Sequence, residues 1–441
     1  MNIPAPTKQC NIILPNNTTK DKPKFPDIIV NDNGSTRAAN TGENLLELAR
    51  YQGVGFRFNM MEFEPEAYEI CGGKLAVSYE QLKSGLISEA SRHGLPKAAI
   101  EDHMTAVCEN YKYHPIKEWL GDAKWDGVSR VKSVIDCLNI KHNELAHVTL
   151  KHWLVGCIAS LYQSNFKSKL VPILQGGQSF KKTAFVERFA QAIPFAFLEG
   201  AELDPDNKDS VLACIRAFIV ELGELERTNK NSQGSLKAFI TKSIDTVRPP
   251  YARKDIKKPR QTHFIATVNG KDFLKDETGS SRFVVLEMTE PANMEEVNRL
   301  LGWQYDGTGA TKHIKPELLK QFWLEVKVLY ETGYGWMLSD DETKMASEAN
   351  EKFNDKGSWY DYILGEYIRH NEVDVSLGWF AAGELVSRDQ KMAARDTRLI
   401  GKALAQLERD GLVDGKTVAG NRKLYYFRKV KPHLCVRELN S

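Results

Sequence analysis

Continuous apolar runs and apolar residues at helical spacing divide the chain into three folded regions behind a polar start. Residues 1–43 show neither pattern and are rich in Asn, Pro, Thr, Lys and Asp, so we expect a flexible arm. Helical spacing dominates residues 44–145, which predicts an α-rich N-terminal domain. Residues 146–345 alternate helical segments with short apolar runs, and residues 350–441 combine helical spacing with a hairpin pattern.

The apolar runs of residues 146–345 predict a buried parallel sheet. Runs at 171–174, 217–220, 263–268 and 283–286 are nearly continuous rather than alternating, as in strands whose two faces are both covered. Open sheets of this kind bind ligands beyond the carboxyl ends of their strands. We therefore expect an α/β fold with a functional site at that edge.

A glycine turn follows the first of these runs, in the string VPILQGGQSFKKTAFVERF. Compared with the phosphate-loop pattern G-x-x-x-x-G-K-[ST], Gly176, Lys182 and Thr183 are in place, and Lys181 stands where the second glycine belongs. Such a turn directs backbone N–H groups and a helix N-terminus at one point, which suits the phosphates of ATP. Lys182 would neutralise the β and γ phosphates, and Thr183 would hold Mg2+. The alternative is an ordinary strand-to-helix connection. The candidate nucleotide contacts are Gly176, Gly177, Gln178, Ser179, Lys181, Lys182 and Thr183.

Polar residues at the ends of the other runs supply candidate catalytic groups. Glu221 and Glu224 follow the second run and could hold Mg2+ and polarise the attacking water. Asn269 ends the third run as an amide that could orient that water, and Arg282 precedes the fourth run. Because apolar strands often end in polar loops, each of these residues is a weak signal by itself. Their order along the chain predicts a nucleotide-hydrolysing core.

Several strings of the chain resemble the virulence-associated protein E family, AAA+ proteins of phages and phage-inducible islands related to superfamily 3 replicative helicases. The resemblance runs from about residue 55 to 286, and its most specific strings are W-D-G-V-x-R at 125–130 and R-P-P-Y at 248–251. The other matching strings are Phe56-Arg57-Phe58-Asn59, Tyr113-His114-Pro115, the phosphate loop, Val220-Glu221-Leu222-Gly223-Glu224-Leu225, Thr267-Val268-Asn269 and Phe273-Leu274-Lys275-Asp276.

The resemblance implies an AAA+ phosphate-loop ATPase core whose subunits form a homo-oligomeric ring, expected to be a hexamer. In such a ring an arginine from the neighbouring subunit stabilises the transferring phosphoryl group, and Arg282 is the first choice for it, followed by Arg248. The chain departs from the family pattern at Lys181, at Ser179, where another glycine is common, and at 280–281, where a second arginine is common. These departures bear on hydrolysis more than on fold.

The most basic short run of the chain, at 253–260, lies just before the third apolar run. The family resemblance implies a hairpin here that projects into the pore of the ring. Lysines on such a hairpin would follow the phosphate backbone of single-stranded DNA without reading sequence. The alternative is a solvated face with no ligand. The candidate DNA contacts are Arg253, Lys254, Lys257, Lys258 and Arg260.

Residues 350–441 predict three helices followed by a β-hairpin around Gly420-Asn421, which is the pattern of a winged helix-turn-helix domain. The third helix of such a domain enters the major groove of duplex DNA. Arg395, Arg398 and Lys402 would be its contacts. Winged helices also serve as protein docking modules, so that alternative stays open.

The composition argues against several other kinds of protein and site. The 441 residues carry a net charge of +2, so affinity for nucleic acid must come from local basic patches. The seven cysteines are scattered and never spaced C-x-x-C, which favours neither a disulfide framework nor a zinc site. The chain has neither an apolar run of membrane-spanning length nor a signal-peptide core at residues 1–6, so we expect a cytoplasmic protein.

Two functions follow from these observations. The first is an ATP-dependent DNA helicase or replication initiator of a phage or mobile genetic element, which uses ATP and Mg2+ and moves along DNA as a ring. The second is an AAA+-shaped DNA-binding or initiator protein that has lost hydrolysis through its altered phosphate loop. The first 145 residues carry no primase signature, so a primase would be a separate partner.

Overall fold

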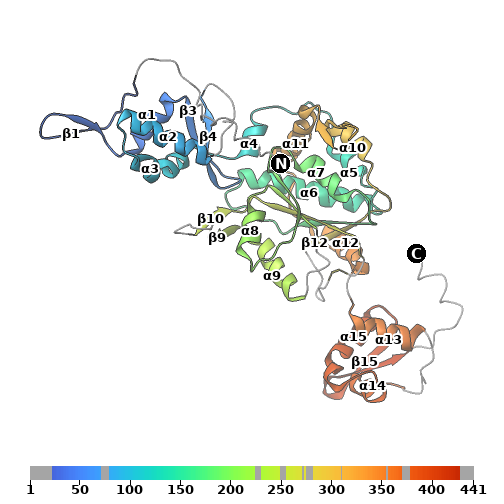
Figure 1. Cartoon of the computed structure of the whole chain (residues 1–441). Coiled ribbons are helices and arrows are strands. Elements are labelled where there is room, and N and C mark those ends of the chain that lie inside the picture. Colours follow the sequence, from blue (N-terminus) through green and yellow to red (C-terminus); the bar gives the residue numbers. More distant parts are fainter. Residues whose placement is uncertain are drawn as a thin grey trace, which may run out of the picture.

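The computed structural model describes residues 22–70, 79–223, 230–248, 255–270, 273–274, 282–308, 310–353, 356–369 and 378–427. Figure 1 shows the chain passing from an N-terminal region, through a core that contains the largest sheet, to a separate C-terminal region. The core contains a parallel sheet with helices around it, which confirms the expected α/β class.

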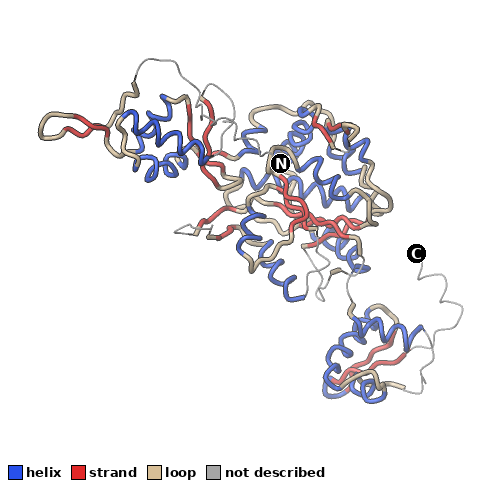
Figure 2. Tube along the Cα trace, in the orientation of Figure 1, coloured by secondary structure: helices blue, strands red, loops and turns tan. Residues whose placement is uncertain are grey.

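Five parallel strands form the central sheet in the order β12-β6-β11-β8-β7. Strand β11 follows β6 and β8 in the sequence but lies between them in space, so the ends of these three strands adjoin. Figure 2 shows the strands running through the middle of the core with helices beside them. The strands are β6 Val171–Gln175, β7 Phe197–Ala201, β8 Ile219–Leu222, β11 His263–Val268 and β12 Phe283–Glu287.

Helices cover both faces of this sheet. Leu174, Ile265 and Val284 pack into one hydrophobic cluster with α6, α7, α10 and α11, while Ile173 and Phe264 pack into a second cluster with α8 and α9. Because successive strand residues point to opposite faces, double coverage requires apolar residues at every position. The helices are α6 Asn143–Tyr162, α7 Lys182–Ala190, α8 Lys208–Ile215, α9 Lys230–Ile240, α10 Met294–Leu301, α11 Pro316–Glu331 and α12 Asp340–Asn350.

Two small antiparallel hairpins extend from the core. Strands β9 (Ile244–Val247) and β10 (Ile256–Pro259) pair with Lys257 opposite Thr246 and Lys258 opposite Asp245. Strands β13 (Trp303–Tyr305) and β14 (Thr311–His313) form the second hairpin. The first hairpin contains part of the basic run for which the sequence predicts DNA contact.

The N-terminal region contains more strand than the sequence predicts. Helices α1 (Gly42–Tyr51), α2 (Tyr79–His93) and α3 (Ala98–Glu109) adjoin a three-stranded sheet in the order β4-β3-β5. The sequence predicts an α-rich domain without this sheet, because β4 has the sequence EPEAYE and lacks an apolar run. The strands of this region are β1 Ile28–Val30, β2 Thr36–Ala38, β3 Val54–Asn59, β4 Glu64–Glu69 and β5 Lys112–Tyr113.

Helices α4 (Pro115–Leu120) and α5 (Val131–Asp136) pack with the core rather than with the N-terminal sheet. Ile116, Leu120 and Val131 belong to the same hydrophobic cluster as α6 and α11. Glu325 of α11 fixes the start of α5, because its carboxylate accepts the backbone N–H groups of Arg130 and Val131 at 2.6 and 2.9 Å. The W-D-G-V-x-R string therefore lies on the core.

The C-terminal region has a hydrophobic cluster of its own. Helix α13 (Ser358–Ile363) continues as a π-helical turn at Leu364–Arg369, and α14 (Ala382–Arg388) and α15 (Thr397–Arg409) follow. Strands β15 (Val413–Val418) and β16 (Arg422–Phe427) then form a hairpin, and Phe380 makes a bridge to Tyr425 beside it. Helices and hairpin occur in the order that the sequence predicts.

None of the helices in the described residues is both long and apolar enough to cross a membrane.

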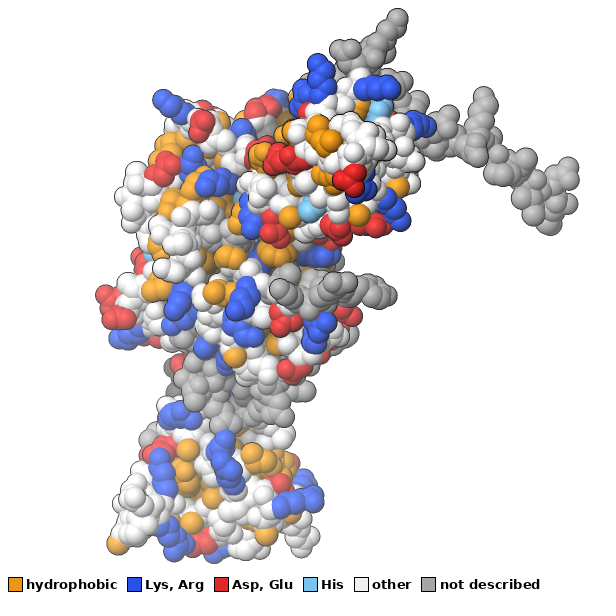
Figure 3. Space-filling view, turned by 90° about the vertical axis from the view of Figure 1, so that its left-hand side faces the viewer, with side chains coloured by type: hydrophobic (Ala, Val, Ile, Leu, Met, Phe, Trp, Pro, Cys, Tyr) orange, Lys and Arg blue, Asp and Glu red, His pale blue; other side chains and the backbone are white. Residues whose placement is uncertain are grey.

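Charges of both signs lie close together on the surface. On the face drawn in Figure 3, Lys and Arg side chains are interspersed with Asp and Glu side chains. This arrangement agrees with the nearly neutral net charge of +2.

Candidate nucleotide site

The glycine turn after β6 is held closed by an aromatic ring. A Cβ atom at Gly176 would lie 2.7 Å from the Phe180 ring, and one at Gly177 would lie 2.9 Å from it. Both distances are shorter than real Cβ contacts, so only glycine fits at these two positions. The turn leads into α7, which begins at Lys182, and thus points the N-terminus of a nine-residue helix at the carboxyl edge of the sheet.

The two positions where the family pattern favours glycine both have left-handed backbone. Ser179 has a φ of 68° and Lys181 has a φ of 62°. Residues with a Cβ adopt this region at a cost of about 1–2 kcal/mol. The loop therefore keeps a glycine-like path without glycine, and the exposed Lys181 side chain points out of the packed loop.

Lys182 lies at the centre of the site and is almost fully buried. Its Nζ donates to the carbonyl oxygens of Gly176 at 2.8 Å and Gly177 at 3.0 Å, and to Asn269 Oδ1 at 2.8 Å. Asn269 is in place because β11 is adjacent to β6. Three acceptors satisfy a buried ammonium group, which would otherwise be costly to desolvate.

Glu221 is the second buried charge of the site, with only 1% of its surface exposed. Its Oε1 accepts the hydroxyls of Thr183 at 2.6 Å and Thr267 at 2.7 Å, and its Oε2 accepts the Gly200 N–H at 3.2 Å. Donors from α7, β11 and β7 thus converge on one carboxylate of β8. Beside it, burial raises the pKa of Glu199, and the Glu221 carboxylate raises it further.

These side chains fit the groups that the sequence predicts for the site. Thr183 and Glu221 offer hydroxyl and carboxylate oxygens, the ligand type that Mg2+ prefers. The glycine turn brings backbone and the Lys182 ammonium together at a helix N-terminus, which suits a polyphosphate. We infer from these side chains and backbone groups that the site fits Mg2+ and a polyphosphate.

The remaining predicted site residues lie in different places. Gln178 is exposed in the loop, and Glu224 lies outside the described residues. Arg282 adjoins the amino end of β6, where its carbonyl accepts the Val171 N–H. The length of β6 separates it from the glycine turn by about 16 Å, at about 3.3 Å per residue. Within one subunit Arg282 is therefore away from Lys182, and Arg248 is exposed at the end of β9.

The structure corrects two of the predicted DNA contacts. Lys258 is 2% exposed, and its Nζ donates to the carbonyl oxygens of Met61 and Ile215. Arg260 is also buried and pairs with Asp245 through Nε at 2.6 Å. Alternation along the hairpin turns these side chains inward, so neither reaches DNA.

Among the described residues of the hairpin, Lys257 is the lysine with an exposed side chain, because it lies on the face opposite Lys258. Arg253 and Lys254 lie outside the described residues. In the C-terminal region, Arg395, Arg398 and Lys402 are all exposed. Their spacing of three and four residues places them on one side of α15 and the turn before it.

Sequence reasoning missed three groups that hold the site together. Thr267 lies in one of the strings that resemble the family, but the sequence assigns a role only to Asn269, two residues later. Gly200 N–H reaches Glu221 because β7 has an irregular register between Leu198 and Ala201, which no sequence pattern indicates. Gln175 donates toward the carbonyl of Gly270 at 3.3 Å and thereby fixes the end of β11.

Together, fold and site define a parallel α/β protein whose glycine turn, buried lysine and buried carboxylate meet at the carboxyl edge of three adjacent strands. The family model described as the virulence-associated protein E-like domain matches residues 120–355. The chain belongs to this family. The match includes the central sheet, the glycine turn and the first hairpin.

Among solved structures, two apo structures of the NrS-1 C-terminal region are similar to the chain. One is 14% identical and covers 87% of this chain and 99% of that chain, with a TM-score of 0.47. The other is 13% identical and covers 87% and 98%, with a TM-score of 0.43. No curated protein matches the sequence.

Proposed function

We propose that the chain is a Mg2+-dependent ATP hydrolase with an AAA+ core that acts on DNA as a helicase or replication initiator of a phage or mobile genetic element. The convergence of Lys182, Thr183, Glu221 and Asn269 carries the proposal, because it joins a phosphate-binding cation to a set of Mg2+ ligands. Membership of the virulence-associated protein E-like family supports it.

Each residue has a separate role in the proposed reaction. Lys182 binds the β and γ phosphates and stabilises the charge that develops on them. Thr183 and Glu221 hold Mg2+, which supplies further positive charge beside the phosphates. Asn269 orients the attacking water through its amide. Thr267 and the Gly200 N–H hold the Glu221 carboxylate in position.

Oligomerisation completes the proposed site. Arg282 lies at the opposite end of β6 from its own glycine turn, and we propose that it acts on the nucleotide of a neighbouring subunit. A ring with six subunits would place each Arg282 in this way. Lys257 on the hairpin would contact single-stranded DNA in the pore, and the C-terminal region would contact duplex DNA as a winged helix through Arg395, Arg398 and Lys402.

Nucleotide binding without hydrolysis is the second candidate function. It is favoured by the contacts of Lys182, whose ammonium already has three acceptors within its own chain. If these contacts persist with ATP bound, the lysine is not free to stabilise the transferring phosphoryl group. The protein would then be a nucleotide-dependent DNA-binding initiator.

Steady-state ATP hydrolysis with and without single-stranded DNA distinguishes the two functions. We expect Mg2+-dependent turnover that falls at least about tenfold in Lys182→Ala, since a lost transition-state contact of about 1.4 kcal/mol has that effect. Lys141→Ala, an exposed lysine on the same core, is the control and should keep full activity. ATP binding without turnover in any assembly state would establish the second function instead.

A further inference from the structure

A pocket of about 500 Å³ lies where the N-terminal sheet meets the core, and we call it the junction pocket. Strands β3, β4 and β5 form one side of it, and the start of α4 and the loop between α7 and β7 form the other. Two of the strings that resemble the family meet here, since Arg57 and Asn59 come from one and Tyr113 from the other. Neither string takes part in the proposed ATP hydrolysis.

Hydrogen bonds and ion pairs fix the polar side of the junction pocket. Glu66 accepts the Asn59 amide at 2.6 Å and also accepts the Tyr113 hydroxyl. Arg57 pairs with Glu66 at 3.3 Å and with Glu118 at 3.2 Å. Its guanidinium also lies 3.9 Å from the centroid of the Tyr113 ring. Because these side chains hold one another in place, binding of a ligand would order few of them.

The apolar side of the junction pocket is open to solvent. Phe195 is 66% exposed, Ile70 is 50% exposed and Tyr68 is 37% exposed. Phe195 also has a φ of 63°, a left-handed conformation that a bulky side chain rarely adopts. Single exposed apolar side chains are ordinary on a protein surface, but several that line one pocket indicate an interaction site.

Negative charge predominates in the lining of the junction pocket. Four carboxylates and one guanidinium line it among the described residues, which gives a net charge of −3. The neighbouring lysines are directed at other rings, since Lys112 lies over Phe58 at 6.0 Å and Lys117 over Tyr162 at 4.7 Å. Such a field repels the phosphate backbone of DNA and attracts a cation. The carboxylates are those of Glu62, Glu66, Glu69 and Glu118, and the guanidinium is that of Arg57.

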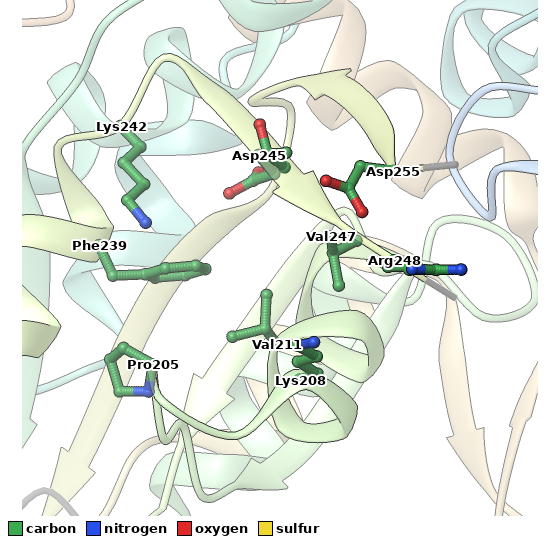
Figure 4. Close-up of a pocket in the computed structure, with 10 residues that line it drawn as sticks. Pro205, Lys208, Val211, Phe239, Lys242, Asp245, Val247, Arg248 and Asp255 are labelled. Carbon is green, nitrogen blue, oxygen red and sulfur yellow. The ribbon is translucent and has the colours of Figure 1, made fainter. Parts of the chain in front are cut away.

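Figure 4 shows a smaller pocket of about 180 Å³ beside the β9–β10 hairpin, which differs in both respects. Its Phe239 ring is 3% exposed and is already contacted by Lys242 and Arg260. The carboxylates of Asp245 and Asp255 lie among its basic groups. That pocket offers neither an open aromatic ring nor a strong excess of one charge, whereas the junction pocket offers both.

We propose that the junction pocket binds a segment of a partner protein in which an arginine lies beside an apolar side chain. The arginine would face the carboxylates of Glu69 and Glu118, and the apolar side chain would cover Phe195 and Ile70. An arginine suits this lining because its guanidinium pairs with carboxylates and stacks on aromatic rings. The proposal requires neither ATP hydrolysis nor DNA binding.

Fluorescence anisotropy of labelled synthetic peptides tests the charge of the junction pocket. The wild type should bind a peptide of alternating Arg and Leu more tightly than one of alternating Glu and Leu. The double variant Glu69→Gln, Glu118→Gln should bind the first peptide at least about fivefold more weakly at low salt, with a smaller difference at high salt. Glu317→Gln, Glu348→Gln is the control, because it makes the same charge change at exposed positions of α11 and α12.

A second variant tests the apolar side of the junction pocket without changing its charge. Phe195→Asn removes the exposed ring, and asparagine adopts left-handed backbone more readily than phenylalanine, so the fold should be kept. We expect binding of the Arg–Leu peptide to fall by about tenfold at low and at high salt, as for an aromatic contact at an interface. Met337→Asn is the control, because Met337 is 60% exposed elsewhere on the core.

Four results would overturn the proposal. The first is equal binding of the Arg–Leu and Glu–Leu peptides by the wild type, and the second is equal binding of the Arg–Leu peptide by the two double variants. The third is displacement of the peptide by spermidine at equal concentration, which would indicate a site for a free polyamine. The fourth is a lower sedimentation mass in Glu69→Gln, Glu118→Gln than in its control, which would indicate that a second copy of the chain occupies the pocket.

Discussion

The sequence assigns ligand-binding roles to charged residues in two places, the carboxyl edge of the central sheet and the β9–β10 hairpin. Only the sheet edge brings its assigned residues together. At the sheet edge, Lys182 donates to Asn269 and Thr183, the next residue of α7, donates to Glu221. On the hairpin, Lys258 is turned into the protein. Residues at the ends of parallel strands must share an edge, whereas residues along a hairpin alternate between two faces.

The strongest test of the sheet edge is the charge of Glu221. In Glu221→Gln, the amide keeps the size of the side chain but removes the charge that would bind Mg2+. We expect hydrolysis to fall by about 100-fold, which corresponds to about 2.7 kcal/mol of activation free energy. Phosphate release at saturating ATP measures the effect. Retention of more than half of the wild-type rate would remove Glu221 from the proposed reaction.

The Thr267 hydroxyl tests whether ATP hydrolysis depends on the position of the Glu221 carboxylate as well as on its charge. Thr267→Val deletes the hydroxyl 2.7 Å from Glu221 Oε1, and we expect kcat to fall by about tenfold through the loss of one hydrogen bond to a charged group of about 1.5 kcal/mol. Thr262→Val is the matched control, because Thr262 is also buried but donates to the Ala217 carbonyl just before the start of β11. Equal losses of kcat in both variants would mean a general packing effect.

The pH dependence of folding stability tests whether the Lys258 side chain is buried. Burial lowers the pKa of Lys258 to about 7, against the opposing effect of Asp245. Between about pH 7 and pH 10.5 the unfolded chain binds more protons at this residue, so its contribution makes folding more favourable as pH rises.

In Lys258→Met this rise should disappear, and the difference between the two unfolding curves isolates the lysine from other titrating groups. The charged groups around Lys258 are Asp245, Arg260 and Arg216, and the neutral His114 lies nearby. Chemical unfolding at pH 7, 8 and 9 measures the effect. Parallel pH profiles would contradict the buried position of Lys258.

The smallest expected effect comes from the left-handed backbone of Lys181. Lys181→Gly should stabilise the folded chain by about 1 kcal/mol, because glycine adopts this conformation without strain. Lys181→Ala is the control, since it removes the charge but retains the Cβ atom and the strain. Urea unfolding compares the two variants. An equal gain in both would assign the effect to charge.

Sequence patterns predicted most of the sheet and of the site edge. Continuous apolar runs indicate strands covered on both faces, and the glycine turn marks the strand that carries the phosphate loop. The sheet order places β11, which Asn269 follows, between β6 and β8, and no local sequence pattern indicates this order. The Gly200 N–H and the inward Lys258 depend on register and packing, and β4 was missed because its sequence is polar.

Calorimetric titration of ATP in the presence of Mg2+ tests the proposed nucleotide site without depending on turnover, ring assembly or DNA. We expect one ATP site per chain in the wild type, with affinity at least about tenfold weaker in Lys182→Ala, since a hydrogen bond to a charged group contributes about 1.5–3 kcal/mol. We also expect loss of the Mg2+ dependence in Glu221→Gln. Equal ATP affinity in the wild type and Lys182→Ala would show that Lys182 does not bind the nucleotide.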